Sequence, residues 1–196
     1  MDIHWYNTLF REVRKMKLLL HMCCAPCSVY PVKVLGEENM EFEGFFYNPN
    51  IHPLEEFLRR KENVERFAAL KNMKVEYDEE FLQDRWQSFE GPGDGRCAMC
   101  YALRMDRTAE LAKERGFDAF STSLLVSPYQ KHELIKELGE KAAGKHGVEF
   151  YYRDFRPGFR EGQQLAKEME LYRQKYCGCI ISLDESDYMK RKNKRV

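Results

Sequence analysis

The sequence predicts an α/β protein with a doubly wound, mostly parallel sheet and helices on both faces. Two observations support this: short apolar runs alternate with segments of helical spacing, and no internal repeat or linker-like stretch interrupts them. Such alternation is typical of parallel strands joined by crossover helices. The 196 residues suffice for one core. We therefore expect residues 1–196 to form a single domain with a basic C-terminal tail.

The pattern begins with the apolar run MKLLLHM over Met16–Met22, which predicts a buried strand. Pro26 suits the first turn of a helix, which we expect to continue to Val34. The aromatic-rich segment Glu41–Asn48 predicts the next strand, because it ends in an Asn-Pro-Asn turn. Apolar residues at helical spacing then predict a helix over Leu54–Leu70.

The second half of the chain continues the alternation. Lys74–Asp78 predicts a third strand, Phe81–Phe89 a short helix and Gly91–Gly95 a loop. A helix is expected over Cys100–Arg115, where Gly116 ends it. The remaining expected elements are a strand with its exit over Asp118–Ser127, a helix over Pro128–Ala143, a strand over Val148–Phe155 and a helix over Arg160–Tyr172.

The charge balance limits the binding partners. Lys plus Arg and Asp plus Glu both number 32, so the formal net charge is zero. A protein that holds nucleic acid by bulk electrostatics is usually basic, so a nucleic acid would have to meet a local patch. The tail Met189–Val196, MKRKNKRV, offers one, and the alternative is a solvated tail without a special role.

The cysteines predict metal binding or redox chemistry. The N-terminus lacks a signal-peptide pattern and no apolar run reaches membrane length, so we expect a cytoplasmic protein without a membrane partner. Structural disulfides are unlikely in a reducing compartment, and buried cysteines that merely fill space would not cluster. The seven cysteines fall into three groups: Cys23, Cys24 and Cys27; Cys97 and Cys100; Cys177 and Cys179.

The first two groups favour an iron–sulfur cluster over structural zinc. Thiolates are the natural ligands of such clusters, and the N-terminus of a helix favours their negative charge. Zinc remains the alternative, since CxxC pairs also form zinc knuckles. Cys177 and Cys179 are separated by one residue, so a disulfide between them would be strained and reducible. Further metal ligation is the alternative for this pair.

The topology predicts where these groups meet. In a doubly wound sheet, ligands bind at the carboxyl ends of the strands, near the point where the strand order reverses. The triplet that starts at Cys23 follows the first strand, Asp78 ends the third, and Ser127 follows the fourth. We therefore expect them at one edge of the sheet.

Four motifs in this order, HMCCAPC, GRCAMCYALR, STSLLVSPYQ and YCGC, resemble the QueH-type epoxyqueuosine reductases. The resemblance runs from about Lys17 to Ser182 and includes YNPNIHP at Tyr47–Pro53. It implies a catalytic domain of Rossmann-like, HUP-type fold, related to ATP-dependent tRNA thiolases. It also implies reduction of epoxyqueuosine to queuosine at the wobble position of tRNA, with an electron donor that stays unknown. The thiolases' Ser-Gly-Gly phosphate loop is absent after the first strand, so we expect no use of ATP.

The resemblance also implies roles for particular residues. Cys177 and Cys179 would form a redox-active disulfide, and a further iron ion would lie beside the cluster. The implied ligands of a [4Fe–4S] cluster are Cys23, Cys24, Cys97 and Cys100. For the additional iron, Cys27 and Asp78 are candidates because we expect them at the same edge of the sheet, and Asp94, close before Cys97, is the alternative carboxylate.

Proton delivery and RNA binding are assigned by position. Tyr129 and His132 follow the fourth strand and are candidates for delivering protons, although an exposed helix residue is the alternative for His132. Aromatic and Arg residues interleave over Tyr151–Arg160, and Arg173 and Lys175 precede the last cysteines, a composition suited to unpaired RNA. The alternative is an amphipathic segment with solvated arginines.

Two other functions stay open: a zinc-stapled RNA-binding module, and a thiol–disulfide oxidoreductase that uses the CxxC pair.

Overall fold

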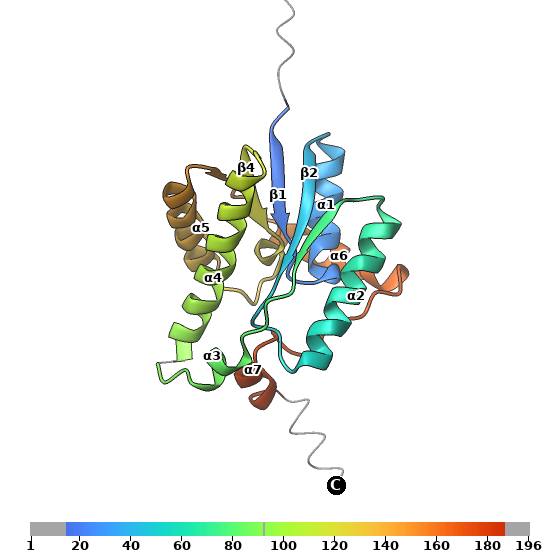
Figure 1. The fold of residues 1–196 in the computed structure, drawn as a ribbon. Helices are drawn as coiled ribbons and strands as arrows, with labels where there is room; N and C mark the ends of the chain where they lie inside the picture. Colours follow the sequence, from blue (N-terminus) through green and yellow to red (C-terminus); the bar gives the residue numbers. More distant parts are fainter. Residues whose placement is uncertain (1–14, 92, 187–196) are drawn as a thin grey trace, which may run out of the picture.

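The computed structural model describes residues 15–91 and 93–186. Its centre is a five-stranded sheet in the order β3-β2-β1-β4-β5, and every neighbouring pair is parallel. The chain adds β2 and β3 on one side of β1 and then β4 and β5 on the other, so the strand order reverses between β1 and β4 (Figure 1). The expected α/β class with a parallel sheet is confirmed. The strands are β1 (Lys17–His21), β2 (Glu41–Tyr47), β3 (Val75–Asp78), β4 (Ala119–Thr122) and β5 (Glu149–Phe150).

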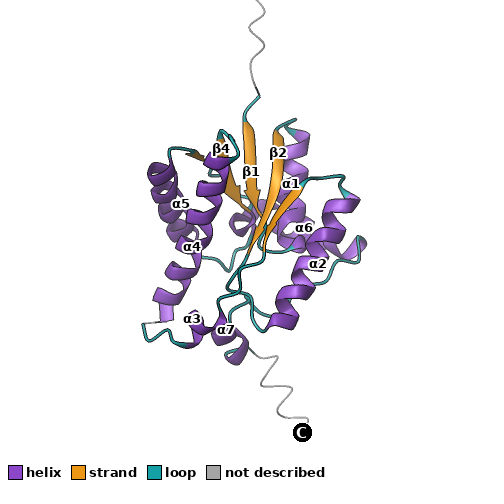
Figure 2. Ribbon diagram, viewed as in Figure 1, coloured by secondary structure: helices purple, strands orange, loops and turns teal. Residues whose placement is uncertain are grey.

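Helices cover both faces of the sheet (Figure 2). On one face lie α1 (Ala25–Glu37), α2 (Leu54–Leu70) and α6 (Phe159–Glu168), and their apolar side chains pack with Leu18 and Leu20 of β1. On the other face lie α4 (Gly93–Glu114) and α5 (His132–His146), which pack around Leu19. Short helices α3 (Gln83–Gln87) and α7 (Ile180–Asp184) contact each other at the carboxyl edge.

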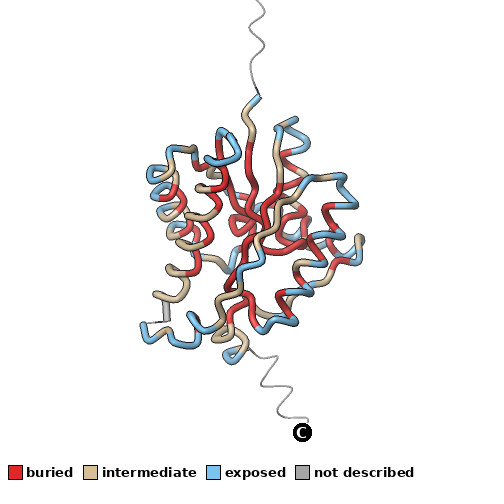
Figure 3. The backbone as a smooth tube through the Cα atoms, in the orientation of Figure 1, coloured by how far each residue is buried: buried red, intermediate tan, exposed pale blue. Residues whose placement is uncertain are grey.

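The central strand is buried on both faces. Leu18, Leu19 and Leu20 are at most 1% exposed, which is why β1 has a continuous apolar run instead of the alternation of a one-sided strand. Figure 3 shows the buried tube running through the sheet and along the inner sides of the helices. In α2, Phe57 and Phe67 are buried toward the sheet. Among the described residues, no helix is both long enough and apolar enough to cross a bilayer.

Several boundaries differ from the expected ones. Helix α4 starts at Gly93, within the predicted loop and ahead of the predicted start at Cys100. Glycine costs a helix about 1 kcal/mol, and burial of Cys100 and Tyr101 offsets this cost. Strand β5 ends at Phe150 because the amide of Tyr152 turns back to the Phe150 carbonyl, at 2.9 Å, and leaves the ladder.

The segment that follows β4 also differs from the one expected from the sequence. Thr122 ends the strand and its hydroxyl accepts from the Leu124 amide, which caps a 3-10 turn over Ser123–Val126. The following residues form a turn, so α5 begins at His132 and not at Pro128. Helix α6 ends at Glu168, short of Tyr172. The basic tail, Met189–Val196, lies outside the described residues.

Candidate metal and redox centre

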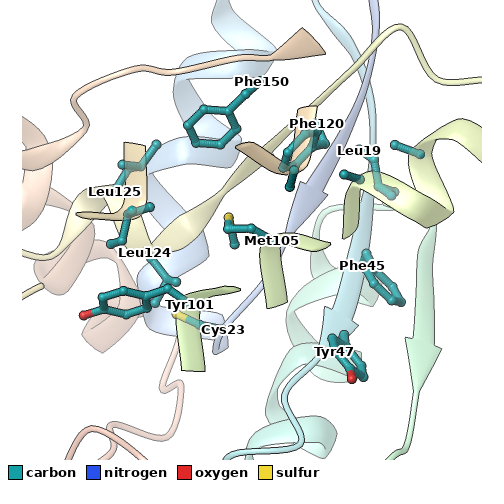
Figure 4. Packing of buried hydrophobic residues seen from close by; sticks show 14 of the residues in the cluster. Leu19, Cys23, Phe45, Tyr47, Tyr101, Met105, Phe120, Leu124, Leu125 and Phe150 are labelled. Atoms are coloured by element: carbon teal, nitrogen blue, oxygen red, sulfur yellow. The ribbon is translucent and has the colours of Figure 1, made fainter. Parts of the chain in front are cut away.

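Three thiols meet where β1 runs into α1. The Sγ atoms of Cys23, Cys24 and Cys27 lie within 4.8 Å of one another, and those of Cys23 and Cys24 are 4.0 Å apart. Among the described residues no other group of three Cys, His, Asp or Glu side chains lies so close. Since thiolates bind a metal at about 2.3 Å, sulfurs at this spacing can reach one ion. All three are buried, and Figure 4 shows Cys23 in the core cluster that includes Tyr101 and Leu124. We call these cysteines the thiol triad.

The local backbone explains this clustering. Cys24 is the last residue before the helix and has an extended backbone, with φ −171° and ψ 164°. Pro26 lies in the first helical turn, where its missing N–H costs nothing. Cys24 and Cys27 are three residues apart at the start of α1, so their side chains fall on one side. The positive end of the helix dipole favours a thiolate there.

The triad shares its protons unequally. Hydrogen bonds with the thiols of Cys24 and Cys27 hold the pKa of Cys23 well below that of a free thiol, against the effect of burial. The Ser123 hydroxyl, 3.3 Å from the Cys23 sulfur, lowers it further. Burial raises the pKa of Cys24, and the hydrogen bonds with its two neighbours raise that of Cys27. These pKa directions make Cys23 the most acidic thiol of the triad.

His21 precedes the triad and has a structural environment. It is fully buried; its Nε2 lies 3.0 Å from the Tyr47 carbonyl and its Nδ1 2.9 Å from the Thr122 hydroxyl. A carbonyl only accepts, so Nε2 carries the proton and Nδ1 accepts from Thr122. Burial and nearby Arg104 lower the pKa of His21 to about 4. The neutral ring thus joins the carboxyl ends of β1, β2 and β4.

The CxxC pair lies on α4 beside the triad and outside its 4.8 Å limit. Cys100 is buried, and Arg104 donates from Nη2 to its sulfur at 3.0 Å. Burial raises the pKa of Cys100 to about 12. Cys97 is half-buried and lines a cavity of about 20 Å³ together with Cys100 and the last two cysteines.

Residues 171–180, which we call the C-terminal strap, close over the thiols. Arg60 of α2 is 2% exposed and donates to the carbonyls of Cys177 at 2.9 Å and Tyr176 at 3.1 Å. Asn63 exchanges two hydrogen bonds with the backbone of Tyr172. The strap brings the Gln174 amide to the triad, where it donates to Cys24 at 3.2 Å and to Cys27 at 3.6 Å.

Cys177 and Cys179 lie in the strap as free thiols, the first exposed and the second buried. Gly178 between them has φ +146°, a conformation that side chains other than hydrogen rarely adopt. A Cβ there would also lie 3.3 Å from the Arg60 guanidinium. The backbone conformation and the close approach to α2 both favour glycine at position 178.

A pocket of about 590 Å³ opens over this edge of the sheet. Sulfur-bearing side chains from three separate segments reach it: Cys27 from α1, Cys97 from α4 and Cys177 from the strap. Its other lining residues include Tyr129, Phe159, Gln163, Lys131, Arg173 and Lys175. A smaller cavity of about 60 Å³ links Cys23 and Cys27 to Cys177.

The structure places the other candidates as follows. Tyr129 lies on the pocket wall. His132 is buried instead of exposed, is not among the pocket's lining residues, and has its pKa lowered by burial. Asp78 ends β3 as expected, and its two carboxylate oxygens accept from Arg107 and from the Glu80 amide. The side chain of Asp94 lies outside the described residues.

The expected RNA-binding segment is largely committed to intramolecular contacts. Arg153 pairs with Glu38, and Arg156 pairs with Asp154 at 2.7 Å. Of Tyr151–Arg160, Phe159 is the residue that lines the pocket. Both ion pairs are partly exposed to solvent, so RNA binding by the rest of this segment stays a prediction.

Sequence reasoning did not assign roles to the polar side chains that contact the sulfurs. Arg104, four residues after Cys100, had a signal in its helical spacing. Gln130, whose amide lies 3.9 Å from the Cys177 sulfur, and Ser123, whose hydroxyl contacts Cys23, both stand in the quoted motif STSLLVSPYQ. Gln174 had no local signal, because it lies 150 residues from Cys24, which it contacts.

Fold and site together define a Rossmann-like α/β protein with a thiol centre suited to metal or redox chemistry at the carboxyl edge of its sheet. A family model described as "Epoxyqueuosine reductase QueH" matches residues 18–185. The chain belongs to this family, so it is an enzyme of the oxidoreductase class.

Three similar relatives carry the same description. The protein of Thermotoga maritima is 38% identical, over 86% of this chain and 91% of its own length. That of Dehalococcoides mccartyi is 36% identical over 85% and 92%, and that of Acinetobacter baylyi 39% over 87% and 82%. Among solved structures, the U34-tRNA thiolase NcsA from Methanococcus maripaludis with its [4Fe-4S] cluster has a TM-score of 0.54. It is 15% identical and is matched over 85% of this chain and 61% of its own length, so this likeness shows the fold alone.

Proposed function

We propose that this protein reduces epoxyqueuosine to queuosine at the wobble position of tRNA. Its membership of the reductase family supports the reaction. The observation that carries the proposal is the convergence of thiols from three distant segments on one pocket, with the triad buried beside it. A pocket lined by thiols, amides and aromatic rings suits a polar nucleoside better than a purely apolar ligand.

The donor set fits an iron–sulfur centre. Every candidate cluster ligand is a cysteine, and thiolates are the ligands that such clusters take in proteins. The buried Arg104 and Arg60 supply positive charge, and Arg104 and the half-buried Gln174 donate hydrogen bonds, around sulfurs that become negative on binding metal. We propose Cys23, Cys24, Cys97 and Cys100 as the ligands of a [4Fe–4S] cluster.

An additional iron is proposed on Cys27 and Asp78. Cys27 lies at the border of the triad and the large pocket, so a metal held there would face the substrate. Asp78 would have to exchange its hydrogen bond from Arg107 for the metal. When bound, these groups would supply single electrons and a Lewis acid for the epoxide oxygen.

The reaction consumes electrons and protons in numbers that the two strap cysteines can supply. Removing the epoxide oxygen breaks two carbon–oxygen bonds, forms a carbon–carbon double bond and releases water, which takes two electrons and two protons. Oxidation of Cys177 and Cys179 from two thiols to one disulfide releases two electrons and two protons. We propose that this pair serves one turnover, after which an external thiol or low-potential electron carrier reduces it again.

The test is anaerobic reconstitution with iron and sulfide, followed by reduction and incubation with epoxyqueuosine-bearing tRNA. We expect the reconstituted protein to be brown and to convert the tRNA to its queuosine form, which mass spectrometry of the nucleosides detects. A Cys23→Ser variant should lose both the brown colour and the conversion. Protein reconstituted with zinc is the matched control and should give no conversion. Failure of cluster-loaded protein to convert the tRNA would overturn the proposal. Thiol–disulfide exchange that survives without iron would favour the oxidoreductase alternative.

A further inference from the structure

Tyr129 is unusual among the large hydrophobic side chains that the structure describes. It is 82% exposed, whereas Leu70, the next most exposed of the large hydrophobic residues described, is 56% exposed. The ring lies at the wall of the 590 Å³ pocket, whose sulfur-bearing residues include Cys27 and Cys97. Exposed aromatic rings beside a pocket are what proteins use to stack on unpaired bases.

The ring is held in place. The edge-to-face contact with Phe159 has a centroid distance of 5.9 Å and an interplanar angle of 84°. The Tyr129 amide donates to the Ser127 hydroxyl at 3.3 Å. Next along the chain, the Gln130 side chain accepts from the Tyr101 hydroxyl at 2.7 Å, which ties the turn to α4. A ring fixed in this way loses little conformational freedom when a ligand binds.

The charge around the ring suits a polyanion. Lys131, Arg173 and Lys175 line the same pocket, and none of its described lining residues is a carboxylate. The chain has zero formal charge, so this basic, carboxylate-free mouth is a local feature. Cations beside a stacking ring match the alternation of phosphate and base in single-stranded RNA.

We propose that Tyr129, supported by Phe159, stacks on the base that flanks the target nucleotide in the anticodon loop, while Lys131 and Arg173 contact the adjoining phosphates. The inference rests on the proposed function and gives Tyr129 a binding role in place of proton delivery. The target base enters the pocket toward the sulfurs, and its neighbour stays at the mouth. Because every base has a π face, this contact tolerates different flanking bases.

The test measures binding of a fluorescently labelled anticodon stem–loop RNA to the metal-loaded enzyme, together with steady-state kinetics on epoxyqueuosine-bearing tRNA. Loss of one base–aromatic stack raises Kd and KM about 5- to 150-fold in Tyr129→Ala, with kcat nearly unchanged. Tyr129→Phe keeps the ring without the hydroxyl and should restore binding. Leu70→Ala is the matched control, because it removes an exposed apolar side chain at the far end of α2.

The outcomes separate the two proposals. If wild-type enzyme converts the tRNA and Tyr129→Ala binds RNA like wild type, the stacking role is wrong and the proposed function stands. A Tyr129→Phe variant with lowered kcat and normal KM would assign the hydroxyl to proton transfer and overturn stacking. If wild type binds the stem–loop through Tyr129 but converts nothing, the proposed function fails alone. Wild-type protein that does not bind the stem–loop would overturn both.

Discussion

Arg60 determines whether the C-terminal strap stays docked over the thiols. Its guanidinium is buried and makes three polar contacts: with the Glu56 carboxylate at 2.8 Å and with the two strap carbonyls of Tyr176 and Cys177. Arg60→Met keeps most of the side-chain volume and removes the charge with all three donors. Glu56, 6% exposed, then keeps the Tyr172 hydroxyl at 2.9 Å and the more distant Arg59 guanidinium at 4.0 Å.

The expected cost follows from burial. Removing one partner of a buried ion pair costs about 3–5 kcal/mol, and the remaining Arg59 guanidinium, 4.0 Å from the Glu56 carboxylate, places the expected cost at the lower end of this range. If this free energy is lost from the docking of the strap, the open population rises about 140- to 3,700-fold, at 1.4 kcal/mol per factor of ten. The double variant Glu56→Gln/Arg60→Met removes the orphaned charge and should recover much of this energy.

Hydrogen exchange measures the strap separately from the core. We expect faster exchange of the amides of Tyr172 and Ile180, which bond to Asn63 and His52 of the α2 side, and no change in β1 amides beyond the global loss of stability. Urea unfolding gives that global term. Strap exchange at the wild-type rate in Arg60→Met, with an unchanged urea midpoint, would refute the role of the guanidinium.

Three further predictions test the packing, the charges and the binding surface. Gly139→Ala places a Cβ 2.5 Å from the Phe150 ring and should lower the free energy of unfolding by about 1–3 kcal/mol. Gly144→Ala in the same helix places a Cβ with no atom within 4 Å and should raise the free energy of unfolding. Urea unfolding of both variants measures this difference, and equal effects would contradict the prediction. The Arg156 side chain lowers the pKa of Asp154 to about 2, below its ordinary value of 3.8. The stability that the ion pair contributes is therefore present above pH 4 and is lost as pH falls toward 2. The Tm difference between wild type and Asp154→Asn should shrink over that range, and a constant difference would argue against the pair. Arg173→Gln should reduce the slope of log Kd against log salt for the stem–loop by about 0.7, and an unchanged slope would remove Arg173 from the RNA contact.

The periodicity of the sequence was sufficient for the fold class. Buried strands and amphipathic helices differ in repeat, and helix Leu54–Leu70 has its predicted bounds because both ends coincide with a change in that repeat. The predicted helix and strand boundaries were wrong where long-range contacts compete with local conformational preference. At Gly93–Gly95 the glycines suggested a loop, yet packing against the core extends α4 through the CxxC pair.

For the site, the sequence by itself determined the number and spacing of the cysteines, their position after the first strand, and the motifs that resemble the reductase family. Only the tertiary structure decided which thiols lie within reach of one another and which residues surround them. Cys23, Cys24 and Cys27 come together because a strand end and one helical turn fix their geometry locally. The contact of Gln174 with the triad, 150 residues away, and of Arg60 with the strap, 117 residues away, depends on how elements pack, and no local pattern encodes such contacts.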